Sequence, residues 1–291
     1  MATHNPFASF KFSTNSQYMR LQANPTMYAS YPAWSHLRVS IDGTLSYHLF
    51  ANTIPETVSL GVGTKIIEIT EGGTTKPGAS VLGTFITAIR LEEGSSFTIL
   101  DTDAPTDKLV FLGNSITVGA NSTYLTQGFP MLFRDAGRNS SVLGYGYGSI
   151  KAFANTVPLI TDTVSDINVL ADGTSTNKLL ILLGTNDYAV DLVPVADFQT
   201  KYSDLLVAIN ASRPDIDIMC ISPIVRTNDG ANANGDTLAD FRTAVEAAAT
   251  GKAYCTYVDG TTLMAAGDLS DGVHPTIAGH IAIYNALELL I

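Results

Sequence analysis

The sequence predicts two domains of different fold class, a β-sandwich or jelly roll followed by an α/β domain with a parallel sheet. Short runs of strand-forming residues separated by turn residues fill the first hundred positions, without helical periodicity. From about Lys108, short apolar runs alternate with longer stretches of helical spacing, which is typical of parallel strands covered by helices on both faces. The linker at residues 101–107 (DTDAPTD) separates the two patterns. We therefore define the domains as residues 1–106 and 107–291.

The first domain is predicted to consist of strands joined by tight turns. The dipeptide Asp42-Gly43 predicts a hairpin between two of the strands. Glycine- and proline-containing turns separate the others, as expected of a β-sandwich. The expected strands span residues 7–13, 36–41, 45–50, 58–62, 65–69, 85–91 and 96–100.

Strands alternating with helices account for the second domain. Phe198, Tyr202 and Leu205 recur at three- and four-residue steps, and Leu238 and Phe241 begin a second such series. This spacing places apolar side chains on one face of a helix. The expected strands span residues 108–112, 141–145, 178–183, 217–221 and 253–258.

Composition excludes several classes of protein. The formal net charge is −11, and 16 Lys and Arg against 27 Asp and Glu leave no surplus cations for phosphates, so we expect no nucleic-acid partner. No apolar run approaches the length of a membrane span. The first residues lack the basic and apolar segments of a signal peptide. The chain is therefore either cytoplasmic or a secreted or periplasmic protein whose signal peptide is trimmed, and its oligomeric state is unknown.

Metals and cofactors are not expected. Two cysteines, Cys220 and Cys255, are too few for a disulfide scaffold. Neither cysteine has a neighbour at metal-ligand spacing, and the five histidines are scattered. Both cysteines fall in expected strands, where core packing is their expected role.

Polar and glycine-rich residues follow four of the five expected strands in the second domain. In an open parallel sheet, ligands bind outside the carboxyl ends of the strands. The blocks that follow the first, second, third and fifth strands are GNSI (113–116), GYGYGS (144–149), GTND (184–187) and DGVHP (271–275).

These four blocks, in this order, resemble those of the SGNH (GDSL-type) hydrolase family. The resemblance covers about residues 107–291, and it implies a flavodoxin-like three-layer domain with ester hydrolase activity and no cofactor. The family usually has Asp before the serine, whereas this chain has Asn114. That departure leaves the role of position 114 open, but it does not affect the nucleophile.

The residue types in these blocks suit nucleophilic catalysis. A serine hydroxyl needs a base that takes its proton, and histidine is suited to this because the unperturbed pKa of imidazole lies near neutrality. Asp271, three residues before His274, can accept a hydrogen bond from the other ring nitrogen. The sequence therefore predicts a triad of Ser115, Asp271 and His274. Pro275 suits the first position of the following helix, which would hold His274 at the helix entrance.

The resemblance also implies an oxyanion hole with three donors. These are the backbone N–H of Ser115, a glycine N–H after the second strand and the side chain of Asn186. We favour Gly148 over Gly146 for the glycine, because a small polar residue, Ser149, follows it. Losing one such donor typically costs about 10²–10³ in rate.

Each of these residues also has a plainer structural interpretation. Ser115 is a candidate helix N-cap, Asn186-Asp187 and Asp271 are candidate turn residues, and His274 is a candidate surface histidine. Because the four blocks occur together and in order, we favour the catalytic interpretation.

Aromatic residues bear on the substrate. Tyr147 and Tyr188, in or just after two of the blocks, are candidates for lining the substrate pocket. Aromatic faces on a β-sandwich can stack on sugar rings, although core packing and a domain interface also account for such residues. Some carbohydrate esterases of the SGNH type carry a jelly-roll domain before the hydrolase domain, and this layout resembles theirs. The first fifty residues contain nine aromatics: Phe7, Phe10, Phe12, Tyr18, Tyr28, Tyr31, Trp34, Tyr47 and Phe50.

We therefore predict a serine esterase that removes short acyl groups, acetyl in particular, from a carbohydrate. Residues 107–291 carry ten basic and 19 acidic side chains, which disfavours anionic polymers and favours a neutral acetylated glycan. One alternative is a lipase or thioesterase for longer acyl chains, although the sequence has no long apolar lid segment. Another is a carbohydrate-binding protein with an inactive hydrolase fold, against which the intact blocks argue.

Overall fold

The chain divides into two compact units, and each is described by itself below. One unit comprises residues 1–104 with 123–126, and the other comprises residues 105–122 with 127–291. The domain boundary that we predict after residue 106 falls outside the described residues and stays a prediction. The computed structural model describes residues 9–26, 36–49, 56–74, 82–100, 108–122, 127–144, 148–150 and 177–291.

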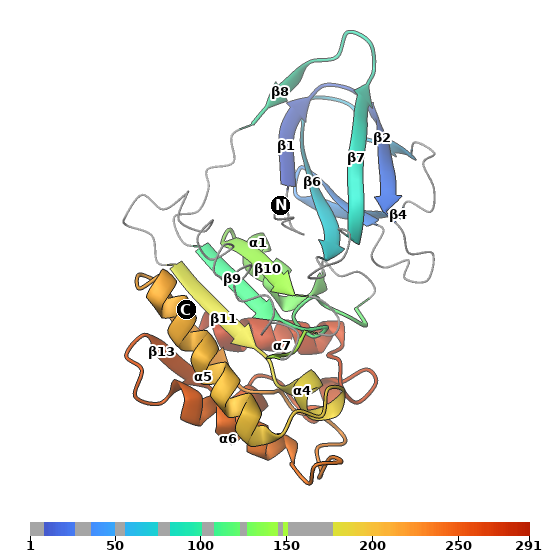
Figure 1. Cartoon of the computed structure of the whole chain (residues 1–291). Coiled ribbons are helices and arrows are strands. Elements are labelled where there is room, and N and C mark those ends of the chain that lie inside the picture. Colours follow the sequence, from blue (N-terminus) through green and yellow to red (C-terminus); the bar gives the residue numbers. More distant parts are fainter. Residues whose placement is uncertain are drawn as a thin grey trace. The chain divides into compact units, whose positions relative to one another are not determined.

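The first unit is an antiparallel β-sandwich (Figure 1), as the sequence predicts. Its strands run in the order β4-β3-β6-β7-β2-β5, and β1 pairs with both β6 and β8. The strands of this unit are β1 (Ser9–Thr14), β2 (Tyr18–Thr26), β3 (His36–Ile41), β4 (Thr44–Leu49), β5 (Glu56–Ser59), β6 (Lys65–Thr74), β7 (Leu82–Leu91) and β8 (Phe97–Ile99).

The Asp42-Gly43 hairpin is confirmed. Strands β3 and β4 pair so that Ile41 lies opposite Thr44, which leaves a two-residue loop. Asp42 and Gly43 have φ angles of 49° and 83°. Two successive positive φ angles belong to a type I′ turn, whose twist matches that of the flanking strands.

Strand β2 is missing from the sequence-based prediction. Its side chains nevertheless alternate, because Met19 and Leu21 are buried while Tyr18 and Arg20 are exposed. The buried pair packs with Phe12 and other apolar residues in the core of this unit. Of the nine aromatics near the amino end, those outside the described residues are Phe7, Tyr28, Tyr31, Trp34 and Phe50.

The second unit is built on a parallel sheet in the order β10-β9-β11-β12-β13. This is the flavodoxin-like order, which confirms the predicted fold class. Among the residues that the structure describes, no helix combines the length and the apolar character needed to span a bilayer. The strands are β9 (Lys108–Gly113), β10 (Asn139–Gly144), β11 (Asn177–Leu182), β12 (Asp217–Ile221) and β13 (Cys255–Val258); the helices are α1 (Phe129–Asp135), α4 (Thr185–Ala189), α5 (Val195–Ser212), α6 (Leu238–Ala249) and α7 (Ile277–Glu288), with short 3₁₀ turns η4 (Gly260–Thr262) and η5 (Ala266–Asp268).

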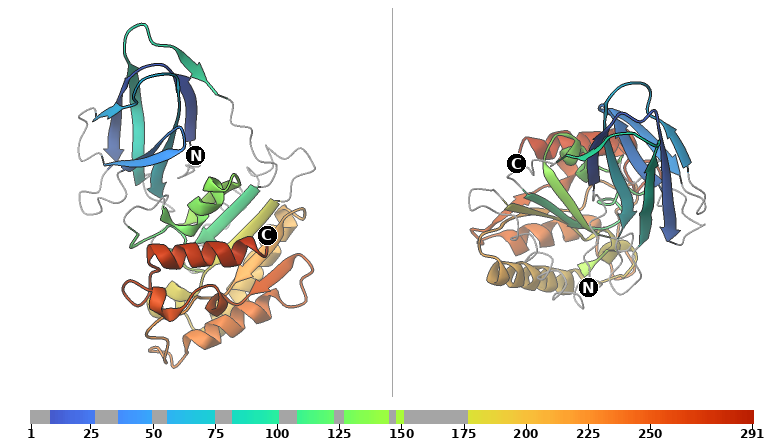
Figure 2. Two further views of the ribbon diagram at one scale, coloured as in Figure 1. Left: turned by 180° about the vertical axis from the view of Figure 1, so that it is seen from behind. Right: turned by 90° about the horizontal axis from the view of Figure 1, so that it is seen from above.

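Helices cover both faces of this sheet. Val110 and Leu112 of β9 belong to the core that α5 and α6 share with the sheet, whereas Phe111 contacts Phe129 and Phe133 of α1. Since neighbouring residues of a strand point to opposite faces, α5 and α6 lie on one face and α1 lies on the other. Helix α7 packs beside α1. Figure 1 shows the α5–α6 face, and the left panel of Figure 2 shows the α7 face.

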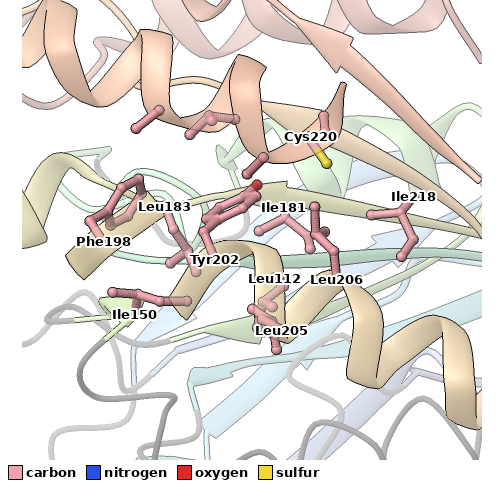
Figure 3. Packing of buried hydrophobic residues seen from close by; sticks show 14 of the residues in the cluster. Leu112, Ile150, Ile181, Leu183, Phe198, Tyr202, Leu205, Leu206, Ile218 and Cys220 are labelled. Atoms are coloured by element: carbon pink, nitrogen blue, oxygen red, sulfur yellow. The ribbon is translucent and has the colours of Figure 1, made fainter. Parts of the chain in front are cut away.

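The apolar side chains that the spacing predicts on one face of α5 fill the core between this helix and the sheet. Figure 3 shows Phe198 of α5 beside Leu183 and Tyr202 of α5 beside Ile181 of β11, and Cys220 of β12 lies in the same cluster. Full burial of one large apolar side chain stabilises the fold by about 1.5–3 kcal/mol. Both cysteines are free; Cys220 is buried and Cys255 packs against this cluster. A rigid core therefore supports the sheet edge where the blocks lie.

Candidate active site

The structure brings the three predicted triad residues together. Ser115 follows β9, and His274 lies in the loop before α7. The Ser115 Oγ is 2.8 Å from the His274 Nε2, and the His274 Nδ1 is 2.8 Å from the Asp271 Oδ2. With Nδ1 donating to the carboxylate, Nε2 is free to accept the serine proton. This chain of contacts is the geometry that a serine nucleophile requires.

Backbone hydrogen bonds keep the Asp271 carboxylate ionised. Its Oδ1 accepts bonds from the His274 N at 2.8 Å and the Val273 N at 3.0 Å. Partial burial opposes ionisation, but the hydrogen bonds from His274 and Val273 outweigh it and lower the pKa of Asp271 to about 2. At neutral pH, Asp271 is therefore a fixed acceptor for the imidazole N–H.

One residue beside this carboxylate is absent from the sequence-based prediction. The Asn121 Nδ2 lies 2.6 Å from the Asp271 Oδ2. Asn121 is six positions after Ser115 and 150 positions before Asp271, and nothing in its local pattern marks it as functional. Only the folded chain shows the contact.

The loop that carries Asp271 and His274 is anchored by a neighbouring loop. The carbonyl oxygen of Gly272 accepts bonds from the Thr227 N at 2.9 Å and the Thr227 Oγ1 at 3.0 Å. Gly272 has a φ of 84°, and a Cβ at this position would collide with the Thr227 hydroxyl. Glycine is therefore required here both for conformation and for space.

The expected position of Pro275 is wrong by two residues. Helix α7 begins at Ile277, and its N-cap is Thr276, whose hydroxyl accepts a bond from the Gly279 N at 3.1 Å. Because Thr276 is the N-cap, Pro275 occupies the position before the cap and not the first position of the helix. His274 still lies just before the helix, as expected.

The nucleophile lies on a tightly hydrogen-bonded segment. The Val118 N donates to the Asn114 O, and the Ala120 N donates to the Ser115 O. The Asn114 Oδ1 accepts a bond from the Ile116 N at 3.0 Å, and its buried Nδ2 has no hydrogen-bond partner among the described residues. Position 114 therefore supplies a turn acceptor, which an asparagine provides without burying a charge.

Gly148 and Asn186 lie next to each other beside this segment. The Asn186 Nδ2 donates to the Gly148 O at 3.0 Å. A Cβ at Gly148 would collide with the carbonyl oxygen of Gly113 and lie 3.1 Å from the Asn114 Cα. The structure thus groups Gly148 and Asn186 with the nucleophile turn. Their role as oxyanion donors remains a prediction, and the competing Gly146 lies outside the described residues.

Asp187 joins two of the sequence blocks. It is fully buried, and its Oδ1 accepts a bond from the Ile150 N at 2.9 Å. Ser149 also hydrogen-bonds to Asp191, just beyond α4. These bonds fix the Gly148 loop against the Asn186 block, so the aspartate of the GTND block has a structural function.

The two tyrosines proposed to line the substrate pocket have different outcomes. Tyr147 lies outside the described residues. The structure places Tyr188 in the core, where it is 5% exposed and packs edge-on against Phe241. Its hydroxyl donates to the Gly230 O at 2.6 Å, and the Arg226 guanidinium lies over its ring. Tyr188 therefore holds the 226–230 loop, and the structure does not place it on an open pocket wall.

Comparison with known proteins identifies the family. Residues 111–282 match the GDSL-like lipase/acylhydrolase family, which covers more than half of the chain. The chain belongs to this family, and the protein is a carboxylic ester hydrolase. A comparison with curated proteins gave no match.

Solved structures share the two-domain fold. A salicylyl-acyltransferase, SsfX3, from a tetracycline biosynthetic pathway aligns with 96% of this chain and 80% of its own, at 18% identity and a TM-score of 0.73. A family two carbohydrate esterase with a carbohydrate-binding domain from Corynascus thermopiles aligns with 98% and 93%, at 17% identity and 0.71. The acetyl xylan esterase Est2A from Butyrivibrio proteoclasticus aligns with 95% and 87%, at 11% identity and 0.63.

Proposed function

We propose that this esterase removes acetyl groups from the hydroxyl oxygens of a carbohydrate, with Ser115 as its nucleophile. The observation that carries the catalytic part is the continuous contact from the Ser115 Oγ through the His274 imidazole to the Asp271 carboxylate. The carbohydrate part is supported by the β-sandwich that precedes the hydrolase unit, because a family two carbohydrate esterase with a carbohydrate-binding domain aligns with 98% of this chain.

In the first step, the Ser115 Oγ attacks the acetyl carbonyl carbon while the His274 Nε2 takes the hydroxyl proton. Negative charge develops on the carbonyl oxygen, and the proposed donors are the N–H groups of Ser115 and Gly148 with the Asn186 amide. The intermediate then collapses and breaks the bond to the sugar oxygen. The sugar hydroxyl leaves with the proton from the imidazolium, and the acetyl group stays on Ser115.

Water completes the cycle by the same route. The His274 Nε2 takes a proton from water as the water oxygen attacks the acetyl-serine carbonyl. Collapse of the second intermediate returns the proton to the Ser115 Oγ and releases acetate. Throughout both steps Asp271 holds the ring orientation and stabilises the imidazolium, as its ionised state allows.

Acetate release from acetylated xylan and acetylated mannan tests this proposal. We expect Ser115→Ala to lower kcat by about 10³-fold or more, because only binding and the oxyanion donors then remain. Ser212→Ala, an exposed serine at the end of α5, is the matched control and should keep the wild-type rate.

Other outcomes would replace the proposal. Equal rates for wild type and Ser115→Ala would exclude the serine mechanism. Faster turnover of long-chain nitrophenyl esters than of the acetate would indicate a lipase or thioesterase. Sugar binding without any acetate release would indicate a carbohydrate-binding protein. Transfer of the acetyl group to an added alcohol in preference to water would indicate an acyltransferase.

A further inference from the structure

The Asp271 carboxylate accepts four hydrogen bonds, and one of them comes from a distant part of the chain. Three come from its own loop, from the Val273 N, the His274 N and the His274 Nδ1. The fourth comes from the Asn121 Nδ2, at 2.6 Å from the Asp271 Oδ2. Asn121 lies on the segment that begins with Ser115, so this bond connects the nucleophile segment to the loop that carries the base.

The backbone around Asn121 holds the side chain in this position. A hydrogen bond from the Ala120 N to the Ser115 O at 2.8 Å closes a turn before it, and one from the Ser122 N to the Gly119 O at 3.1 Å closes a turn that contains it. Asn121 itself has a φ of 66°. Among residues with a Cβ, asparagine adopts this left-handed conformation more readily than most. Residues in such conformations cluster at functional sites.

The amide lies beside the contact between the base and its carboxylate. The Asn121 Nδ2 is 3.3 Å from the Ser270 Oγ and 3.5 Å from the His274 Nδ1. Because the Nδ1 proton is directed to Asp271, the imidazole is a neighbour of the amide and not its acceptor. The titratable groups that face Asn121 are therefore Asp271 and His274, while Ser270 is neutral.

We propose that Asn121 is a positioning residue, which fixes the Asp271 Oδ2 toward the His274 ring; this rests on the triad roles proposed above. The neutral amide leaves the negative charge on the carboxylate. Without the amide, only the imidazole holds the Asp271 Oδ2, so the exposed carboxylate can turn about its Oδ1, which the Val273 and His274 N–H groups still hold. The orientation of the imidazole toward the Ser115 Oγ is then less well defined.

Two substitutions separate the contribution of the Asn121 amide from that of its backbone conformation. Asn121→Gly removes the amide and suits a positive φ, whereas Asn121→Ala removes the amide and strains the backbone. We expect both variants to lower kcat by at least about tenfold, the lower end of the effect of losing one hydrogen bond to a charged group, with KM unchanged. Asn121→Ala should lose more thermal stability than Asn121→Gly, because only the alanine variant also strains the backbone. Wild-type kcat in Asn121→Gly would overturn the proposal and leave a purely conformational role.

The pH dependence of a third variant distinguishes a positioning role from a purely structural one. Asn121→Asp keeps the shape, and at acidic pH the introduced carboxyl is protonated and donates to the Asp271 Oδ2 as the amide does. At higher pH it ionises, and two like charges then face each other. We expect the activity of this variant relative to wild type to fall as pH rises. A pH-independent ratio would contradict the proposed contact.

Controls distinguish this proposal from the one on which it rests. Asn234→Ala removes an exposed amide that donates to the Leu192 O at 2.7 Å, and it should keep the wild-type kcat. Nitrophenyl acetate hydrolysis by Ser115→Ala is measured in parallel. If that variant is active, the triad itself is wrong; if it is inactive while Asn121→Gly matches wild type, only the role of Asn121 is wrong.

Discussion

The two halves of the candidate site are held by different forces. The nucleophile half, residues 113–116 with Gly148 and Asn186, is largely buried, with Asn114 1% and Asn186 9% exposed. The base half, residues 270–274, is more open; the Asp271 side chain is 43% exposed and that of His274 is 22% exposed. Burial in the core together with hydrogen bonds fixes the first half, whereas the exposed second half depends mainly on hydrogen bonds to side chains and a neighbouring loop. Substitutions in the two halves should therefore differ in how much they lower the free energy of unfolding and how much they lower kcat.

The largest effect on this comparison is expected from Asn186→Ala in the nucleophile half. If the Asn186 amide is an oxyanion donor, its loss lowers kcat by about 10²–10³. The Gly148 O also loses its bond, so the free energy of unfolding falls by about 1–3 kcal/mol. Steady-state kinetics and urea denaturation measure the two effects.

Asn232→Ala is the matched control for this substitution. The Asn232 Nδ2 also donates to a backbone carbonyl, that of Tyr188, at 3.0 Å. It should lose a comparable amount of stability while keeping most of kcat. A similar loss of kcat in both variants would show that the effect of Asn186 is structural.

A smaller effect is expected from His280, on the helix that follows the base half. His280 is fully buried against Phe129, and neither ring nitrogen has a hydrogen-bond partner among the described residues. Burial, with a contribution from nearby His274, lowers its pKa to about 4. The unfolded chain, with a histidine pKa near 6.5, therefore takes up a proton first as pH falls, and stability is lost between about pH 6.5 and pH 4.

His280→Leu should remove this pH dependence. From pH 7 to pH 5, wild type should lose about 2 kcal/mol of unfolding free energy that the variant does not lose. Denaturation at the two pH values measures the difference, and the carboxylates contribute equally to both proteins. The same pH dependence in wild type and variant would show that His280 is accessible to protons in the folded state.

The smallest effect is expected from the N-cap of α7. Thr276→Ala and Thr237→Ala each remove a capping hydroxyl, and each should lower the free energy of unfolding by about 1 kcal/mol. Only Thr276 adjoins the base half, so only its substitution should also lower kcat, by up to about fivefold. Equal kcat values in the two variants would show that the base half does not depend on the start of α7.

Local patterns predicted most of the fold. Phe198 and Tyr202 revealed α5 because one face of this helix is buried, and Asp42-Gly43 revealed a hairpin because few dipeptides suit its backbone. Strand β2 was missed although Met19 and Leu21 alternate with exposed residues. The start of α7 was misplaced because a proline and a threonine are both typical of helix starts, and the hydroxyl of Thr276 determined the outcome.

The site could be predicted only for residues that stand in recognisable sequence blocks. Ser115, Asp271 and His274 stand in ordered blocks after strands, and parallel topology brings such positions to one edge. The burial of Tyr188 depends on Phe241 and on a loop some forty positions away. Likewise, the contact of Asn121 with Asp271 joins residues 150 positions apart. No local pattern encodes contacts of this kind.

The order of the parallel sheet has a consequence for folding kinetics. Strand β9 pairs with β11 so that Lys108 lies opposite Asn177, 69 positions later. The two ends of the intervening chain must therefore be brought together before this central pairing contributes stability. Domains dominated by such distant contacts fold more slowly than helical bundles of similar stability. We expect refolding of this unit to be sensitive to temperature and protein concentration, because unpaired strands are exposed for longer.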